Sequence, residues 1–159
     1  MKAIHWIIAA AALSFAQAAP ASAGVNDPEI LIYRFPGVRD DGGTNSVGVA
    51  TVFFCTNFSG VQENIRIVTR DFNGTLKTNV PIGITHLNTL TAATHPTSLY
   101  VLSAVSLGTG AVFQGTVAIA ATSVNIICTA VTIDAADVKP AFAVPLRGIR
   151  FNPAPGSQE

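Results

Sequence analysis

The sequence predicts an all-β protein, an antiparallel β-sandwich of immunoglobulin-like architecture. Short segments rich in β-branched and aromatic residues recur about every 8 to 12 residues, turn-forming residues separate them, and no segment has a convincing helical period. Strands without intervening helices form layered all-β folds because each sheet must bury one face against another layer. The chain of 159 residues has nine Lys+Arg, nine Asp+Glu and 49% hydrophobic residues. This composition disfavours disorder, and it provides no net positive charge to hold a nucleic acid.

The N-terminal segment has the pattern of a secretory signal peptide. Lys2 provides an early positive charge, Ile4 to Phe15 is an apolar run, and Ala21-Ser22-Ala23 is a small-residue cleavage site. The apolar run is shorter than the roughly 20 residues that a spanning helix needs. We therefore expect cleavage after Ala23, no integral membrane span, and a secreted or periplasmic protein. One sandwich domain is expected over 24–151, followed by an exposed tail over 152–159.

The strands can be assigned from their side-chain patterns. Residues 47–56 are β-branched or aromatic on both faces, which indicates a buried central strand. Residues 63–72 alternate apolar and polar side chains, as in a sheet with one wet face. Asn73-Gly74 follows and predicts a hairpin, because its turn positions need positive φ. The other expected strands cover 29–35, 75–82, 85–92, 99–107, 112–121, 124–133 and 142–151.

Turn signals separate these strands. Two of them coincide with Asn-x-Ser/Thr sequons at Asn57 and Asn73, which we interpret as turn chemistry, since their use depends on the host. The turn and loop signals are Pro36-Gly37, Asp40 to Asn45, Ser59-Gly60, His95-Pro96, Gly108-Thr109-Gly110 and Val138-Lys139-Pro140.

The two cysteines, Cys55 and Cys128, lie in similar apolar strand segments. An exported chain meets an oxidising compartment, where an even pair of cysteines is expected to be bonded. We therefore predict a disulfide between them. The spacing is similar to that of the inter-sheet bridge of immunoglobulin sandwiches, so we expect the bond to lock two facing layers. A redox-active pair is disfavoured, because reactive thiols are accessible and have low pKa values.

Between Thr78 and Ile133 there is no Asp, Glu, Lys or Arg. The simplest interpretation is that threonines provide the polar side chains on the solvent-facing sides of ordinary strands. The alternative is that part of this surface is covered by a second copy in a homo-oligomer, by a glycan or envelope partner, or by an outer membrane. The lack of aromatic girdles counts against a membrane barrel. The threonines expected at the surface include Thr85, Thr89, Thr91, Thr94, Thr97 and Thr116.

Few residues indicate chemistry. His86 and His95 have no cysteine or carboxylate in metal-ligand spacing, so we expect no metal and no cofactor. No G-x-S-x-G motif or local Ser/His/Asp group is present. A carboxylate pair assembled from distant strands stays open, although Glu29 and Glu63 are the only glutamates between the signal segment and Glu159.

On sandwich folds, binding residues usually lie in loops at the ends of the strands. The run from Asp40 to Asn45 can offer oxygen ligands but lacks the alternating spacing of a calcium loop. We expect the ligand loops at 37–46, 93–98 and 108–110. The candidate ligand residues are Asp40, Asp41, Asn45 and His95.

Three segments carry a resemblance to a group of small exported bacterial proteins. They are Cys55-Thr56-Asn57 followed by Ser59-Gly60, the run Ala121-Thr122-Ser123 with Asn125 and Cys128-Thr129-Ala130, and the ending Arg150 to Glu159. The resemblance implies an exported, compact protein and brings no activity with it.

The sequence thus predicts an exported, non-catalytic binding or surface-associated β-sandwich module whose ligand is not specified. Three alternatives stay open: a self-assembling envelope protein, a secreted hydrolase with an assembled carboxylate site, and a small outer-membrane β-barrel.

Overall fold

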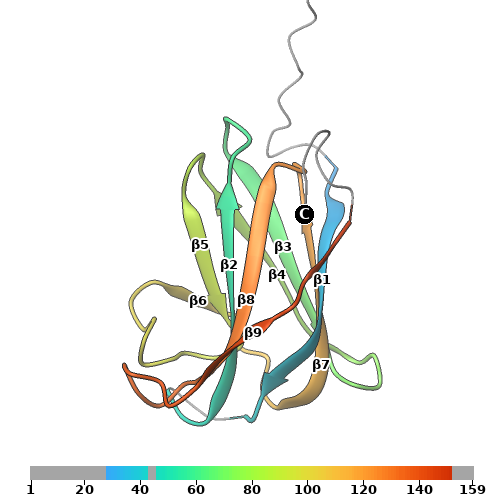
Figure 1. Ribbon diagram of the computed structural model, residues 1–159. Helices are drawn as coiled ribbons and strands as arrows, with labels where there is room; N and C mark the ends of the chain where they lie inside the picture. The colour runs from blue at the N-terminus through green and yellow to red at the C-terminus, as the bar shows by residue number, and fades with distance from the viewer. Residues whose placement is uncertain (1–27, 43–45, 152–159) are drawn as a thin grey trace, which may run out of the picture.

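The computed structural model describes residues 28–42 and 46–151. Two five-stranded sheets face each other, and the described residues contain no helix (Figure 1). The predicted all-β sandwich is therefore confirmed. The expected signal segment and its cleavage site, the tail over 152–159 and Asn45 lie outside the described residues. Within the described ranges, no helix has the length and apolar character needed to cross a bilayer.

The first sheet has the strand order β10-β1-β7-β3-β4, and all its neighbours are antiparallel. Its strands are β1 (Ile30–Asp40), β3 (Glu63–Arg70), β4 (Leu76–Ile84), β7 (Val112–Ala121) and β10 (Ile149–Arg150). The second sheet has the order β6-β5-β2-β8-β9, in which only the β5–β6 pair is parallel. Its strands are β2 (Val49–Asn57), β5 (Thr89–Ala93), β6 (Ala104–Ser106), β8 (Ile126–Asp134) and β9 (Ala143–Leu146).

The hydrophobic core lies between the two sheets. Successive strand side chains alternate between faces, so every second residue of the central strands enters it. Phe35 of β1 and Phe53 of β2 meet edge to face, with ring centroids 5.5 Å apart. Since each ring is 1% exposed, this pair joins the two layers near the middle of the core.

The strand predicted to be buried on both faces is β2. Its inward residues enter the core, and its outward Val52 belongs to a second apolar cluster with Ala93 and Ile133. Tyr100, from the segment between β5 and β6, packs edge to face on Phe54 at 5.3 Å. This segment covers part of the outer face of the second sheet, which explains the apolar pattern on both sides of β2.

The predicted disulfide is present, with an S–S distance of 2.11 Å between Cys55 and Cys128. The prediction that it locks two facing layers is wrong. The two cysteines are register partners on β2 and β8, neighbouring strands of the second sheet. The bond therefore reinforces one strand pair within the second sheet and does not join the two layers.

The predicted turn at Pro36-Gly37 is also wrong, because β1 continues through both residues. The strand accommodates them through register shifts against β7 between Pro36 and Val38, and Gly37 has φ of 83°. A glycine with positive φ at an irregularity lets the strand bend without ending.

The hairpin predicted at Asn73-Gly74 is present but has a longer turn. The Asp71 amide donates to the Thr75 carbonyl at 3.1 Å, and of the two turn residues only Gly74 has positive φ, at 86°. The strand predicted over 142–151 is divided. It forms β9 in the second sheet and β10 in the first, with the chain crossing between the sheets at Arg147 and Gly148.

Candidate functional site

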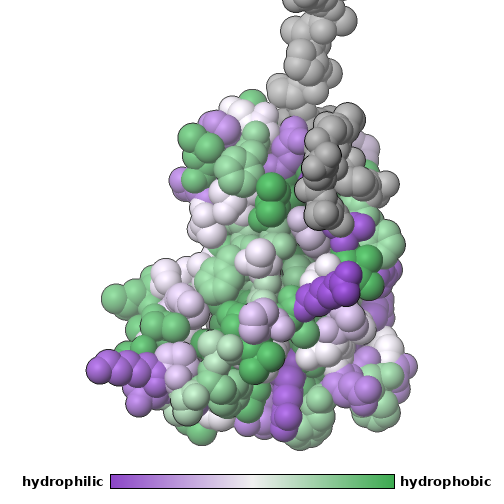
Figure 2. Space-filling model, viewed as in Figure 1, coloured by the Kyte–Doolittle hydropathy of each residue, from purple (hydrophilic) through white to green (hydrophobic). Residues whose placement is uncertain are grey.

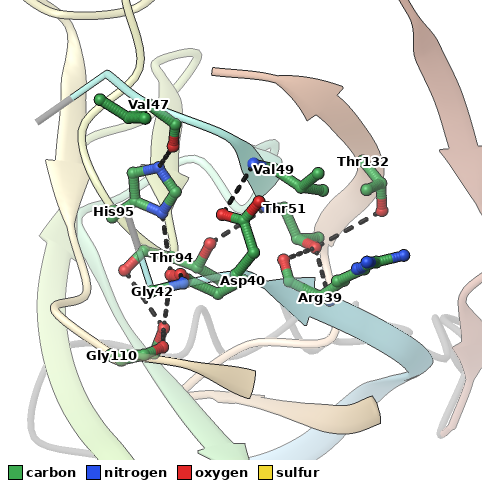
Figure 3. Close-up of polar contacts among 12 residues, drawn as sticks. Arg39, Asp40, Gly42, Val47, Val49, Thr51, Thr94, His95, Gly110 and Thr132 are labelled. Atoms are coloured by element: carbon green, nitrogen blue, oxygen red, sulfur yellow. Dashed lines mark hydrogen bonds and ion pairs between the residues drawn. The ribbon is translucent and has the colours of Figure 1, made fainter. Parts of the chain in front are cut away.

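The three loops predicted to bind ligand meet at one end of the sandwich. Asp40 is the last residue of β1, His95 follows β5, and Thr109 lies in the turn before β7. Strands β1 and β5 end at the lower end of the molecule in Figure 1, where β7 begins. Figure 3 shows Asp40 and His95 pointing toward each other across this end. The structure therefore brings together two of the predicted ligand residues.

The His95 ring is held at both nitrogens. Its Nδ1 lies 3.0 Å from Oδ2 of Asp40, and its Nε2 lies 3.0 Å from the backbone carbonyl oxygen of Val47. His95 is 5% exposed and Asp40 is fully buried. Both neighbours are oxygen acceptors, and the Asp40 contact has the separation of an ion pair, so the site suits an imidazolium, which carries N–H groups on both nitrogens.

The Asp40 carboxylate accepts two further hydrogen bonds. The Thr109 hydroxyl donates to Oδ2 at 2.9 Å, and the Gly42 amide donates to Oδ1 at 2.7 Å. We call Asp40, His95, Thr109 and the Val47 carbonyl the clasp. The neighbouring Asp41 has a similar role, since its Oδ1 accepts a hydrogen bond from the Val49 amide at 2.9 Å. Both aspartates therefore organise loop backbone.

The clasp shifts the pKa values of its two charged members in opposite directions, upward for His95 and downward for Asp40. The hydrogen bond to Asp40 is the largest influence on the His95 pKa and outweighs burial, so this pKa lies above its ordinary value. Burial taken alone would raise the pKa of Asp40, but hydrogen bonds from His95, Gly42 and Thr109 outweigh it and the pKa is lowered. Both shifts favour the charged pair.

Two threonines extend this network toward β2. The Thr51 amide donates to the Thr94 hydroxyl at 3.0 Å, and the Thr51 hydroxyl donates to the Arg39 carbonyl at 2.8 Å. Thr94 and Thr97 were expected at the surface, yet both are fully buried. That expectation is wrong for these two residues, because the segment after β5 turns inward and its hydroxyls can meet loop backbone.

The clasp lacks the arrangement of a catalytic triad. In a triad, the histidine faces a nucleophile on one nitrogen and a carboxylate on the other. Here Nε2 faces a backbone carbonyl, and the Thr109 hydroxyl donates to Asp40. What the clasp can do is fix four chain segments in place through one buried ion pair.

No family model, curated protein or solved structure matches this chain. The geometry therefore carries the functional argument. In the described part of the chain, no three His, Cys, Asp or Glu side chains gather in a way that could hold a metal ion. His86 lies apart from the clasp, where its Nδ1 accepts a hydrogen bond from the Gly60 amide at 3.0 Å.

The two glutamates considered for a hydrolase site do not form a carboxylate pair. Glu29 pairs with Arg66 at 2.5 Å, and Arg66 belongs to the outward set of β3 residues. Glu63 begins β3, is fully buried, and accepts a hydrogen bond from the Thr122 hydroxyl. The carboxylates thus lie on opposite faces of the first sheet.

Sequence reasoning missed two features of these polar clusters. Thr109 was placed in a ligand loop but not identified as a partner of Asp40, and buried Glu63 was not identified as the partner of Thr122. The only available signal for Glu63 was an acidic residue at an inward position of the alternating pattern over 63–72.

Proposed function

We propose that this protein is an exported, non-catalytic binding module that acts at or outside the cell envelope. The observation that carries the proposal is the occupancy of the His95 ring, whose two nitrogens contact Asp40 and Val47 in a buried site. A general base needs a nitrogen directed at substrate. The clasp instead serves as a scaffold for the loops at this end.

Two features support export. The leader-like pattern over 1–23 has a charged start, an apolar run and a small-residue cleavage site. The Cys55–Cys128 bond is buried, with the cysteines 1% and 5% exposed. A buried bond between strands is a structural disulfide of the kind that persists in oxidising compartments.

The test is a retention assay with cell-envelope fragments of the producing organism. We expect the purified protein to be retained saturably and to release no soluble carbohydrate or peptide. Retention without saturation, or no retention, would contradict the binding function. Release of soluble products that is lost in His95→Gln would show that the protein is an enzyme and would overturn the non-catalytic assignment.

Self-assembly is the second candidate, and exposed apolar side chains on two adjacent loops, Val101 and Leu102 on one and Val138 on the other, favour it. The loop between β5 and β6 exposes Leu102 at 98% and Val101 at 61%, and Figure 2 shows green at the edge of the molecule over this loop. Ser98 ties it to the loop after β8, because its amide donates to the Ala135 carbonyl at 2.9 Å. Exposed apolar clusters of this kind often mark protein contacts.

Sedimentation at increasing concentration tests self-assembly. If the two loops join copies of the chain, Leu102→Asn restores a monomer. Leu87→Asn provides a matched control, because Leu87 is 64% exposed and lies in the turn between β4 and β5, away from both loops. A strict monomer at high concentration would exclude this candidate.

A further inference from the structure

The charged residues are segregated between the two sheets, although the net charge of the chain is zero. The strands of the second sheet contain one charged residue, Asp134 at the end of β8. Figure 2 shows the outer face of this sheet mostly in white, pale tones and green. The two carboxylates within first-sheet strands, Asp40 and Glu63, are buried. Basic side chains therefore dominate the strand charges that the first sheet exposes.

On the outer face of the first sheet, small side chains of β7 lie between arginines of the neighbouring strands. Register pairs Arg34 of β1 with Ala118 of β7, and places Thr116 of β7 between Pro36 and Arg70. Side chains of register partners share a face. A strip of small residues on β7 is thus flanked by arginines from β1 and β3.

Two cavities adjoin at Pro36 on this side. One has a volume of about 450 Å³ and is lined by Pro36 together with Arg147, Ile149 and Arg150. The other has a volume of about 320 Å³, and Phe72 and Gln114 contribute to its lining. Since Pro36 borders both, they lie side by side, one at the chain crossing before β10 and the other at the β3–β4 hairpin, and we call the pair the groove.

Arg150 and Arg147 both line the first cavity, but the Arg150 guanidinium is turned to the inner side of the sheet, with its buried register partner Tyr33. Arg150 lies over the Tyr33 ring, 5.8 Å from its centroid, and donates to the Val124 carbonyl at 3.0 Å. Arg147 is exposed. Arg66 is paired with Glu29, whereas Arg34 and Arg147 have no ion pair with a carboxylate in the described ranges. Arg147, which lines the first cavity, and Arg34, whose register partner Ile149 lines it, are therefore available to bind an external anion.

We propose that this groove binds a glycan whose sugar units carry carboxylates. The inference rests on the proposed binding function and specifies its ligand class. Guanidinium groups bind carboxylates through paired, charge-assisted hydrogen bonds. Phe72, which is 77% exposed, offers an aromatic surface for a sugar ring, and Thr116 and Gln114 offer partners for sugar hydroxyls.

The groove fits an acidic sugar better than a nucleic acid. Asp71 lines the same cavity as Phe72, and its carboxylate can accept hydrogen bonds from sugar hydroxyls. The same charge repels closely spaced phosphates. Spaced carboxylates between hydroxyl groups match this mixture of arginine and aspartate.

The test is calorimetric titration of the purified protein with an oligogalacturonate and with a neutral malto-oligosaccharide of the same length, at low salt. We expect binding of the acidic oligomer only. Arg34→Gln and Arg147→Gln should each weaken it about tenfold, the loss expected for one charge-assisted contact. Lys139→Gln makes the same change of charge in the loop after β8 and should leave the affinity within about twofold.

Several results would overturn the inference: no binding of the oligogalacturonate, equal binding of the neutral oligomer, or equal losses for Arg147→Gln and Lys139→Gln. Equally tight binding of a single-stranded oligonucleotide would also overturn it, since the surface would then be a general polyanion site. The envelope assay separates this inference from the proposed function. Retention that the oligogalacturonate does not displace contradicts the ligand class alone, whereas absent retention contradicts the binding function.

Discussion

Both ring nitrogens of His95 face oxygen acceptors in a buried site, an arrangement that favours the charged ring. The clasp therefore predicts a dependence of stability on pH. In the unfolded chain histidine has a pKa of about 6.5, and the folded-state pKa of His95 is higher. Its contribution is complete below that unfolded value and is lost as pH rises through the folded-state pKa.

Asp40 determines how the stability that the clasp provides is lost at low pH. Its folded-state pKa is lowered, so its contribution is present above an unfolded value of about 3.9 and is lost as pH falls through the folded-state pKa. Asp41 is a further negative group that favours charged His95. We expect the clasp to stabilise the fold most between about pH 4 and 6.5, which urea unfolding at pH 5 and pH 8.5 would measure.

His95→Gln separates the clasp from other titrating groups. The variant leaves the buried Asp40 charge without its cation, and breaking a buried pair in this way costs about 3 to 5 kcal/mol. It should also lose the decline in stability between pH 6.5 and 8.5. His86→Gln, which removes a histidine outside the clasp, should keep that decline. An unchanged pH profile in His95→Gln would show that the ring is neutral in the folded protein.

Asn57 and Asn73 occupy similar sequons but have opposite structural roles. Asn57 is fully buried, and its amide group donates to the carbonyls of Val61 at 2.7 Å and Ile84 at 3.0 Å. Asn73 is exposed in the hairpin turn. Asn57→Ala should lower the free energy of unfolding by about 1 to 3 kcal/mol, since the buried Ile84 carbonyl loses this donor and the Val61 carbonyl keeps only the Ser59 hydroxyl. Asn73→Ala should change it by less than about 0.5 kcal/mol in the same urea titration, and equal losses would contradict this assignment.

At the scale of strands, the alternation of apolar and polar residues predicted strand bounds correctly where both neighbouring strands impose regular pairing. The strand predicted over 112–121 has the bounds of β7, because its neighbours β1 and β3 impose regular pairing on both sides. Pro36 and Gly37 misled the prediction, because their turn preference is local. Whether a bulge absorbs them depends on the partner strand, which is distant in sequence.

The candidate site was predictable in its members but not in its geometry. Asp40 and His95 were identified from loop positions, yet their contact requires β1 and β5, on different sheets, to end at the same end of the molecule. The backbone carbonyl of Val47 that occupies Nε2 has no sequence signature. Residue types therefore indicated the site, whereas long-range chain placement decided its chemistry.

Gly148 permits the chain to cross from the second sheet to the first. A Cβ atom there would lie 2.5 Å from the Phe35 ring, which is in the core and 1% exposed. Gly148→Ala should therefore destabilise the fold by about 1 to 3 kcal/mol through overpacking. Gly83→Ala is the matched control, because its nearest contact is the flexible Gln62 side chain at 3.2 Å. Equal thermal unfolding of the two variants would contradict this role for Gly148.

At the scale of the whole molecule, the charged side chains are distributed unevenly between the two sheets, although the net charge of the chain is zero. Carboxylates within the first-sheet strands are buried, whereas arginines of the same strands reach the surface. The second sheet instead has an uncharged outer face reinforced by the disulfide. One layer is thus suited to a charged ligand, and the other to rigidity or apolar contact.

The disulfide also affects how the whole chain folds. The β2–β8 pair joins residues 73 positions apart, and closing such a loop costs entropy before the strands can pair. By the chain-entropy model, the crosslink stabilises the fold by up to about 4 kcal/mol. We expect the Cys55→Ala/Cys128→Ala variant to lose stability on this order.

The same variant should refold more slowly in stopped-flow dilution from urea, by about tenfold if β2 and β8 pair before the rate-limiting barrier. The reason is that the oxidised chain begins folding with these two strands already held close together. Wild-type protein unfolded without reductant is the comparison. If the refolding rates agree and only unfolding accelerates, then β2 and β8 pair after the rate-limiting barrier.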